Sequence, residues 1–186
     1  MKKISKYILI LAALFAVGCD NYDDRYVEEY ASVLRLSAFG ENIISVPAST
    51  SETVYDLNVL RSGHNINCDA EASFRTMTDA EWTKYANTYG VQRYYKLPAD
   101  CYKLGDSSDE NGYVVKFAPN ETVMPVSVTI FSEKLHEYSE TLPPPAFAGE
   151  EWANVICIPF LLDVSKGSVF SERENLILRL VYKGNE

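Results

Sequence analysis

Hydrophobic and polar residues alternate along most of the chain after residue 30. A period of two sends successive side chains to opposite faces of a strand, so each run predicts a β-strand with one buried and one solvated face. The clearest runs are 34–38, 55–59, 68–75, 124–130 and 176–182. Many short strands of this kind, separated by turns, are typical of two antiparallel sheets packed as a sandwich.

One later segment lacks this alternation. Residues 155–164 are apolar at almost every position, which indicates a central strand that is buried on both faces. Pro159 lies inside the segment and has no N–H to donate to a neighbouring strand. We therefore expect a bulge at Pro159, or a break in the pairing on one edge of the strand.

A single helical segment interrupts the strands. Thr78 and Glu81 form the pattern of a capping box, and Gly90 can end the helix in a left-handed conformation. Trp82 and Tyr85 share one face of this helix, because helical neighbours recur every three or four residues. A helix this short needs a surface to pack on. We therefore expect Trp82 to be mostly buried under a sheet, with Tyr85 beside it.

These elements together predict the fold class. The turn signal Asn111-Gly112 lies between segments 102–104 and 113–115 and predicts a hairpin there. The whole pattern predicts a mainly β protein, an immunoglobulin-like antiparallel β-sandwich with one short crossover helix. We expect residues 31–186 to form this sandwich as a single domain.

The first residues predict an export signal. Three lysines precede an apolar run over 7–17, which is too short to span a bilayer. The run ends at Ala16-Val17-Gly18-Cys19, which resembles the lipobox of bacterial lipoproteins. The resemblance implies that residues 1–18 are a lipoprotein signal peptide and that Cys19 carries the lipid, such as palmitate. The alternative is an ordinary secretory signal with a chance cysteine.

Residues 19–30 are acidic and polar, which predicts a flexible tether. They also resemble the export signal that sends Bacteroidota lipoproteins to the outer face of the outer membrane, and a plain solvated linker is the alternative. The expected location is the outer membrane, with the lipid anchor in the membrane and the protein facing the cell exterior. The excess of acidic over basic residues, 26 to 17, argues against a nucleic-acid partner.

No pattern for catalysis or metal binding stands out. The two histidines lack partners at the spacing of a metal site or a catalytic triad. The loop 105–112 collects oxygen ligands but lacks the final glutamate of an EF-hand. The acidic pairs Glu133/Glu137 and 150–151 lie in charged stretches that indicate solvated loops. We therefore expect no catalytic residue, no metal, no cofactor and no enzymatic activity.

Three cysteines remain beside Cys19. Cys68 and Cys157 lie on strand faces that look buried, where a free thiol behaves as a small hydrophobic group. An exported protein can form disulfides, and Cys68 with Cys101 is the pair to test. The odd number of cysteines favours free thiols.

Several motifs in fixed order resemble a known domain. Trp82-x-x-Tyr85-Ala86-Asn87 is followed by Tyr94-x-x-Leu97-Pro98, and Ile158-Pro159-Phe160 precedes the closing strand 176–182. This order resembles the domain of unknown function found near the N-terminus of many Bacteroidota surface lipoproteins. The resemblance implies an immunoglobulin-like sandwich on the cell surface with a link to glycan use, and it supplies no catalytic residues.

Aromatic residues are the remaining functional candidates. The chain has 13 tyrosines, 8 phenylalanines and 2 tryptophans. Flat rings in loops can stack on the C–H groups of a sugar face. The candidate ligand-binding rings are Trp152, Tyr94, Tyr95 and Phe147, and core packing is the alternative for each of them. We therefore hypothesise a non-enzymatic accessory protein that binds polysaccharide or assists its uptake. The alternative is a structural subunit with a surface protein partner, and a hydrolase ranks third.

Overall fold

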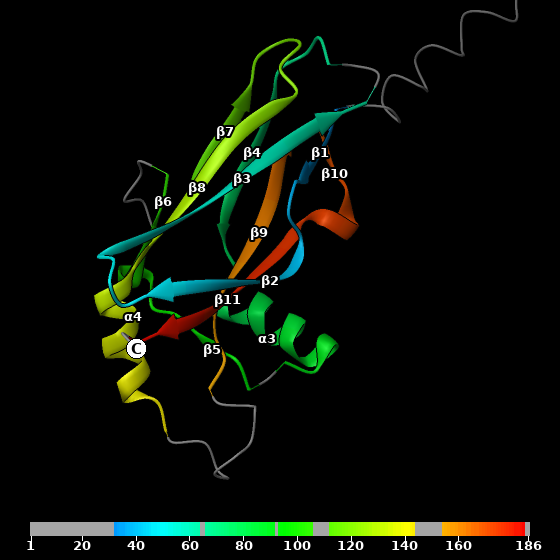
Figure 1. Cartoon of the computed structure of the whole chain (residues 1–186). Helices are drawn as coiled ribbons and strands as arrows, with labels where there is room; N and C mark the ends of the chain where they lie inside the picture. The colour runs from blue at the N-terminus through cyan, green and yellow to red at the C-terminus, as the bar shows by residue number, and fades with distance from the viewer. Residues whose placement is uncertain (1–31, 64–65, 92, 106–111, 144–153, 185–186) are drawn as a thin grey trace, which may run out of the picture.

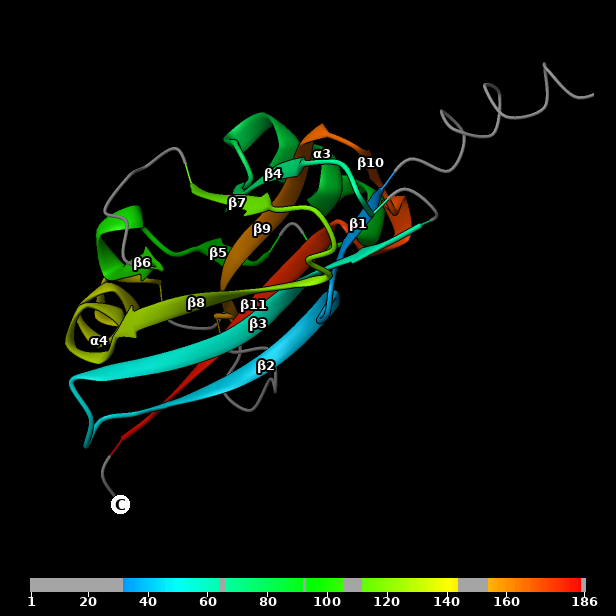
Figure 2. The ribbon, with the colours of Figure 1, turned by 90° about the horizontal axis from the view of Figure 1, so that it is seen from above.

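The computed structural model describes residues 32–63, 66–91, 93–105, 112–143 and 154–184 (Figure 1). Two β-sheets pack face to face, and two helices lie against them (Figures 1 and 2). The expected fold class, a mainly β, immunoglobulin-like sandwich, is confirmed. A second helix is present that the alternation pattern did not predict.

The first sheet has five strands in the order β10-β1-β3-β8-β6. Its strands are β10 (Ser168–Val169), β1 (Val33–Leu36), β3 (Glu52–Ser62), β8 (Val123–Phe131) and β6 (Tyr102–Leu104). All neighbours in this sheet are antiparallel except β1 and β10, which pair in parallel. The predicted runs 55–59 and 124–130 lie within strands of this sheet, and the run 34–38 begins on β1, which ends at Leu36.

The second sheet has six strands. Five follow the order β2-β11-β9-β4-β7, and β5 pairs with β9 outside that path. Their bounds are β2 (Gly40–Pro47), β11 (Asn175–Lys183), β9 (Ile156–Lys166), β4 (Ala70–Thr76), β7 (Tyr113–Phe117) and β5 (Tyr95–Lys96). Two pairs, β2 with β11 and β5 with β9, are parallel, so the sheets are less uniformly antiparallel than the pattern predicted.

The chain passes from one sheet to the other at most of its turns. Segment 102–104 becomes β6 in the five-stranded sheet, whereas segment 113–115 begins β7 in the six-stranded sheet. The hairpin predicted between them is therefore wrong. A turn signal such as Asn-Gly identifies where a chain reverses, but the sheet that each strand joins depends on long-range packing.

The core fills the space between the two sheets. Phe74 of β4 and Phe160 of β9 stack with ring centroids 4.7 Å apart, and both are fully buried. Leu34 and Leu36 face them from β1 and are also fully buried. Each such side chain contributes about 1.5–3 kcal/mol on burial, so the alternating pattern itself supplies the main stabilisation.

Strand β9 is central, as its apolar sequence predicted, and Pro159 interrupts the pairing on one edge. On that edge β9 pairs with β4 as far as Phe160, and with β5 at Ile156 and Cys157. The Pro159 carbonyl accepts a hydrogen bond from the Met77 N–H at 2.8 Å. In a strand, the nitrogen and the carbonyl of one residue point towards the same neighbouring strand. The nitrogen of Pro159, which carries no hydrogen, therefore faces the point where the neighbour of β9 changes from β4 to β5. The pairing with β11 is continuous.

Helix α3 (Asp79–Tyr89) forms as predicted. The Thr78 hydroxyl accepts from the Glu81 N–H, the Glu81 carboxylate accepts from the Thr78 N–H, and Gly90 ends the helix with φ 74°. A side chain at Gly90 would strain this left-handed conformation. Short 3-10 turns follow later in the chain at Ala99–Cys101 and Ser171–Arg173.

Helix α4 (Ser132–Thr141) follows β8 directly and covers one end of the sandwich (Figures 1 and 2). It carries Glu133 and Glu137, so their prediction as loop residues is wrong, although both are exposed as expected. His136 also lies on this helix and is exposed. The helix buries Leu135 completely in the core.

The three cysteines described are free thiols. Cys157 is buried as predicted, whereas Cys68 is exposed because β4 begins only at Ala70. Burial raises the pKa of Cys157 to about 12 and that of Cys101 to about 11. Both groups therefore stay protonated and inert at neutral pH. The described residues include no helix that is long and apolar enough to cross a membrane.

Candidate functional site

The outer face of the six-stranded sheet carries a small second core under α3. Met77, Cys157 and Ile177 are buried there. Trp82 and Tyr85 of α3 pack on this apolar patch and remain partly exposed, as do Tyr94 and Leu161, which pack there too. The prediction that Trp82 is mostly buried under a sheet, with Tyr85 beside it, is confirmed, although part of each ring stays exposed because α3 lies on the outer face of the sheet.

The aromatic residues of α3 form a continuous row. The Trp82 and Tyr85 ring centroids are 5.9 Å apart with the planes inclined by 16°. The Tyr85 and Tyr89 centroids are 4.4 Å apart with an angle of 37°. Tyr89 ends the row at 65% exposure. The helical spacing of three and four residues produces this row, because it stacks these side chains along one edge of the helix.

Polar groups flank the row of rings. The Tyr94 hydroxyl donates to the Glu41 carboxylate at 3.2 Å, and Arg179 pairs with the same carboxylate at 3.2 Å. The Arg179 guanidinium also lies over the Tyr94 ring, 5.3 Å from its centroid. These three residues come from β2, from the segment before β5 and from β11. We call this surface the α3 face; its residues are Trp82, Tyr85, Tyr89, Tyr94, Glu41 and Arg179.

The phenols of the α3 face remain neutral hydrogen-bonding groups. Burial raises the pKa of Tyr94, and the neighbouring Glu41 carboxylate raises it further. Burial likewise raises the pKa of Tyr85, with smaller effects from Tyr89 and Glu41. Both hydroxyls therefore stay protonated above their ordinary range and can donate or accept hydrogen bonds.

A hollow of about 480 Å³ opens beside the N-terminal end of α3. Arg75 spans it and contacts the Glu81 carboxylate at 2.8 Å and the Asp163 carboxylate at 3.3 Å. The hydrogen bonds from Arg75 hold the pKa of Glu81 down at about 2. Glu174 also lines the hollow, and burial raises its pKa. Leu161 belongs both to this hollow and to the apolar patch under Trp82, so the two features adjoin.

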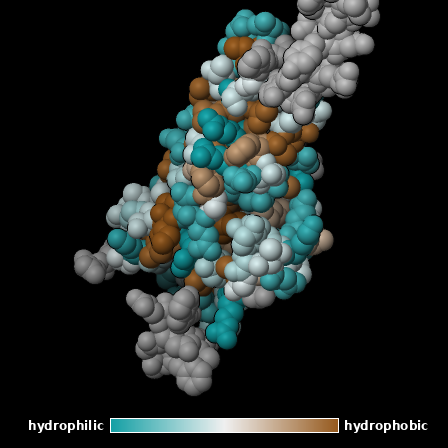
Figure 3. Space-filling model, turned by 90° about the vertical axis from the view of Figure 1, so that its right-hand side faces the viewer, coloured by the Kyte–Doolittle hydropathy of each residue, from teal (hydrophilic) through white to brown (hydrophobic). Residues whose placement is uncertain are grey.

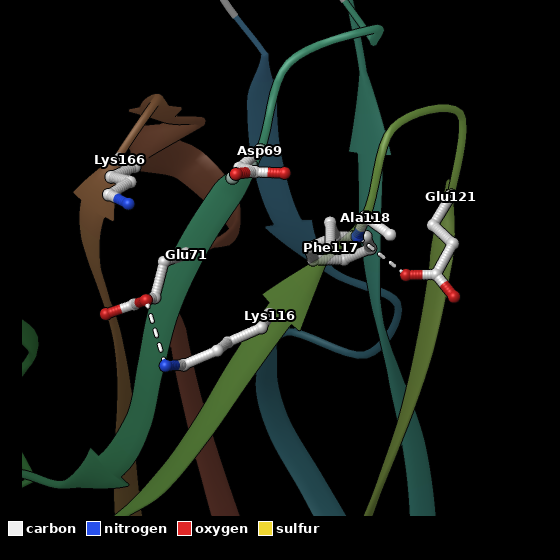
Figure 4. A pocket seen from close by; sticks show the side chains of 8 residues that line it. Asp69, Glu71, Lys116, Phe117, Ala118, Glu121 and Lys166 are labelled. Atoms are coloured by element: carbon white, nitrogen blue, oxygen red, sulfur yellow. Dashed lines mark hydrogen bonds and ion pairs between the residues drawn. The ribbon is translucent and has the colours of Figure 1, made fainter.

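A second hollow, of about 370 Å³, lies farther along β4 and β9, at the β7 edge of the same sheet (Figure 4). Lys116 and Glu71 pair across it at 3.5 Å, and the Glu121 carboxylate accepts from the Ala118 N–H. Lys166 lines it as well. Its charges are of both signs and its aromatic residue, Phe117, is buried. No cluster of His, Cys, Asp and Glu suited to a metal ion occurs among the residues that the structure describes.

The structure separates the ligand residues that the sequence suggested. Tyr94 lies on the α3 face. Tyr95 pairs with Ile156 in the sheet and lies near Tyr138 of α4. Burial is the first cause of the raised pKa of Tyr138, and Tyr95 contributes after Cys101 and Cys157. Cys19, Phe147, Trp152 and most of the loop 105–112 lie outside the described residues.

Other residues of the α3 face escaped the sequence reasoning. The spacing of Trp82 and Tyr85 predicts only packing, because helical spacing of aromatic residues is also the pattern of a buried stripe. Glu41 and Arg179 are 138 positions apart in the sequence, yet their side chains form an ion pair. Nothing local marks such a pair, and only the parallel register of β2 with β11 brings the two together.

Comparisons with known proteins support the fold. No protein-family model matches the sequence, and no curated protein matches it. A solved structure from Bacteroides ovatus ATCC 8483, described as a "putative carbohydrate binding protein", is similar, with a TM-score of 0.56 at 14% identity. The alignment covers 82% of this chain and 37% of that one. This chain therefore has a fold similar to about a third of that larger protein.

Proposed function

We propose that this protein binds glycan through the α3 face and does so without catalysis. The observation that carries the proposal is the row of Trp82, Tyr85 and Tyr89, which leaves aromatic surface exposed beside hydrogen-bonding groups. Sugar rings present C–H groups that stack on such rings. Their hydroxyls are matched by carboxylate, guanidinium and phenol groups, which Glu41, Arg179 and Tyr94 supply.

Two further features support this proposal. The similar protein from Bacteroides ovatus is itself described as a "putative carbohydrate binding protein". The α3 face is also partly preformed, since Glu41 is held by both Tyr94 and Arg179, and preorganised groups lose less entropy when a ligand binds. Ligand sites typically combine an apolar surface with a few fixed polar groups in this way.

The proposal includes the setting of the protein. Lipid attached at Cys19 anchors the chain to the outer membrane, and residues 19–30 tether the sandwich outside it. Strand β1, where the described chain begins, lies at the upper end of the molecule in Figure 1, whereas α3 lies towards the lower end. A lipid anchor before β1 would therefore be attached at the end of the molecule that is farther from α3. Replacing Cys19 with Ala should abolish fatty-acid labelling and release the protein from the membrane fraction.

The direct test of glycan binding is an array of host and plant polysaccharides, probed with protein lacking residues 1–19. We expect binding to at least one class, and weaker binding by a Tyr89→Ala variant. A matched control is Val54→Ala, because Val54 is an exposed apolar residue on β3 of the other sheet. Silence across the array at high protein concentration would contradict the proposal.

The alternative function, a subunit of a surface assembly, is favoured by one observation. Strand β2 is the outer strand of the six-stranded sheet in the described chain, and its Ile43 is 66% exposed. Such an edge can accept another strand. The hydrophobic residues on one side of the molecule form separate patches among hydrophilic ones (Figure 3), whereas permanent interfaces are more continuously apolar. We therefore place this function second. Measuring the molecular mass of wild-type protein and of the Ile43→Lys variant in solution tests whether the protein assembles through the β2 edge.

A further inference from the structure

A further hollow, of about 340 Å³, lies at the end of the sandwich that α4 covers. The turn between β2 and β3 forms one wall with Ser49, Thr50 and Ser51. Helix α4 forms another wall, and Tyr182 near the end of β11 completes the lining. The Ser132 N–H donates to the Ser51 carbonyl at 3.0 Å, which fixes the turn against the start of the helix.

Ser132 has an unusual environment. The residue is only 3% exposed, and its hydroxyl has no hydrogen-bond partner in the part of the chain that the structure describes. A buried hydroxyl without a partner destabilises a fold. Phe131 occupies the N-cap position of α4, and its side chain cannot accept a hydrogen bond from the first turn. The Ser132 hydroxyl is therefore a buried hydrogen-bonding group without a partner among the described residues, in a residue that lines the hollow.

The other walls supply a flat surface and an acceptor. The His136 and Tyr182 rings stack with centroids 4.8 Å apart and planes inclined by 6°. Glu133 adds a carboxylate at the start of α4. Among the described residues that line this hollow there is no lysine or arginine. Hydroxyls, a stacked ring pair and one carboxylate suit a neutral, polyhydroxylated ring better than an anion, since a carboxylate repels an anion.

The geometry points to this hollow as a second sugar subsite that holds a single neutral pyranose unit. The inference rests on the proposed glycan-binding function but involves none of the residues of the α3 face. The volume is within the range of small-ligand sites. Two sites on one module would also raise the avidity for a long polysaccharide, because the second contact becomes intramolecular.

The test follows the imidazole NMR signals of His136, assigned with a His136→Ala variant, while methyl glycosides of glucose, galactose, mannose and xylose are added. We expect saturable shifts with at least one glycoside. Ser132→Ala should weaken that binding about tenfold, the loss of one hydrogen bond, without lowering the melting temperature. Thr53→Val is the matched control, since Thr53 Oγ1 also lacks a partner among the described residues but does not line the hollow.

The outcomes separate this inference from the proposed function. Unmoved His136 signals overturn the second subsite, and polysaccharide binding that still depends on Tyr89 would leave the proposed function intact. Equal affinity in Ser132→Ala and wild type also overturns the subsite, because the buried hydroxyl would then play no part. Saturable shifts that are lost in Ser132→Ala and retained in Thr53→Val support it, whether or not the α3 face binds.

Discussion

Helices α3 and α4 are similar in length and differ in what holds them. Helix α3 has a reciprocal capping box at its start and a left-handed glycine at its end, and Ala86 is its one buried residue. Helix α4 has no side-chain cap, yet it buries Leu135 completely and packs Tyr138 and Leu142 against the core. Local signals define α3, whereas tertiary packing defines α4.

The difference explains where function can lie. Capping stabilises a helix by about 1 kcal/mol per cap without using its side faces. The aromatic face of α3 is therefore only partly used in packing, and Tyr89 is left largely exposed. In α4 the apolar residues are used to close the sandwich. A helix held at its ends can leave its aromatic face partly open to a ligand, whereas α4 uses its apolar face for packing and can offer a ligand only side chains outside that face, such as the exposed His136.

The largest expected effect concerns Leu135. Replacing Leu135 with Ala should lower the free energy of unfolding by about 2–5 kcal/mol, because the side chain is 0% exposed and the change leaves a cavity. Urea unfolding followed by circular dichroism measures this loss. Leu142, at the end of the same helix and only partly buried, offers a milder comparison. A loss below 1 kcal/mol at Leu135 would show that packing does not define α4.

A smaller effect is expected at Trp82. Emptying a fully buried tryptophan site costs about 3–5 kcal/mol, but Trp82 lies on the outer face of the sheet and keeps part of its surface exposed. We expect Trp82→Ala to lower the free energy of unfolding by about 1–2 kcal/mol, within the range of ordinary point mutations. Thermal unfolding of the variant measures the change, and a loss as large as that at Leu135 would contradict the difference between the helices.

The cap of α3 predicts a pH dependence. The pKa of Glu81 is lowered from its ordinary value of 4.5 to about 2, first by the hydrogen bonds from Arg75. A lowered pKa in the folded state stabilises the fold above the unfolded value and loses this effect as the pH falls through the folded value. Wild type should therefore exceed Glu81→Gln in stability near pH 7, and the difference should shrink between about pH 5 and pH 2. A difference that is constant with pH would show that the ion pair plays no part.

The sequence predicts the fold well where local and long-range preferences agree. Alternation placed β1, β3, β4, β8 and β11, and the capping box placed α3. The sequence does not predict α4, because Phe131 and Ser132 give no capping box and the helix forms by burying Leu135. Nor could it reveal the contact of Glu41 with Arg179, which depends on a parallel register. Of the suggested ligand residues in the described chain, Tyr94 lies on the α3 face and Tyr95 lies near α4.

Replacing Tyr89 with Ala should have the smallest effect on stability and the most informative effect on binding. Tyr89→Ala should change the free energy of unfolding by less than about 0.5 kcal/mol, as surface substitutions do, because Tyr89 is 65% exposed. The measurement is a binding isotherm for the strongest polysaccharide, recorded with wild type, Tyr89→Ala and the control Val54→Ala. We predict that Tyr89→Ala weakens binding by about 1–3 kcal/mol, as the loss of an aromatic anchor does, and that Val54→Ala binds like wild type. Equal affinity for all three proteins would contradict the assignment of glycan binding to the α3 face.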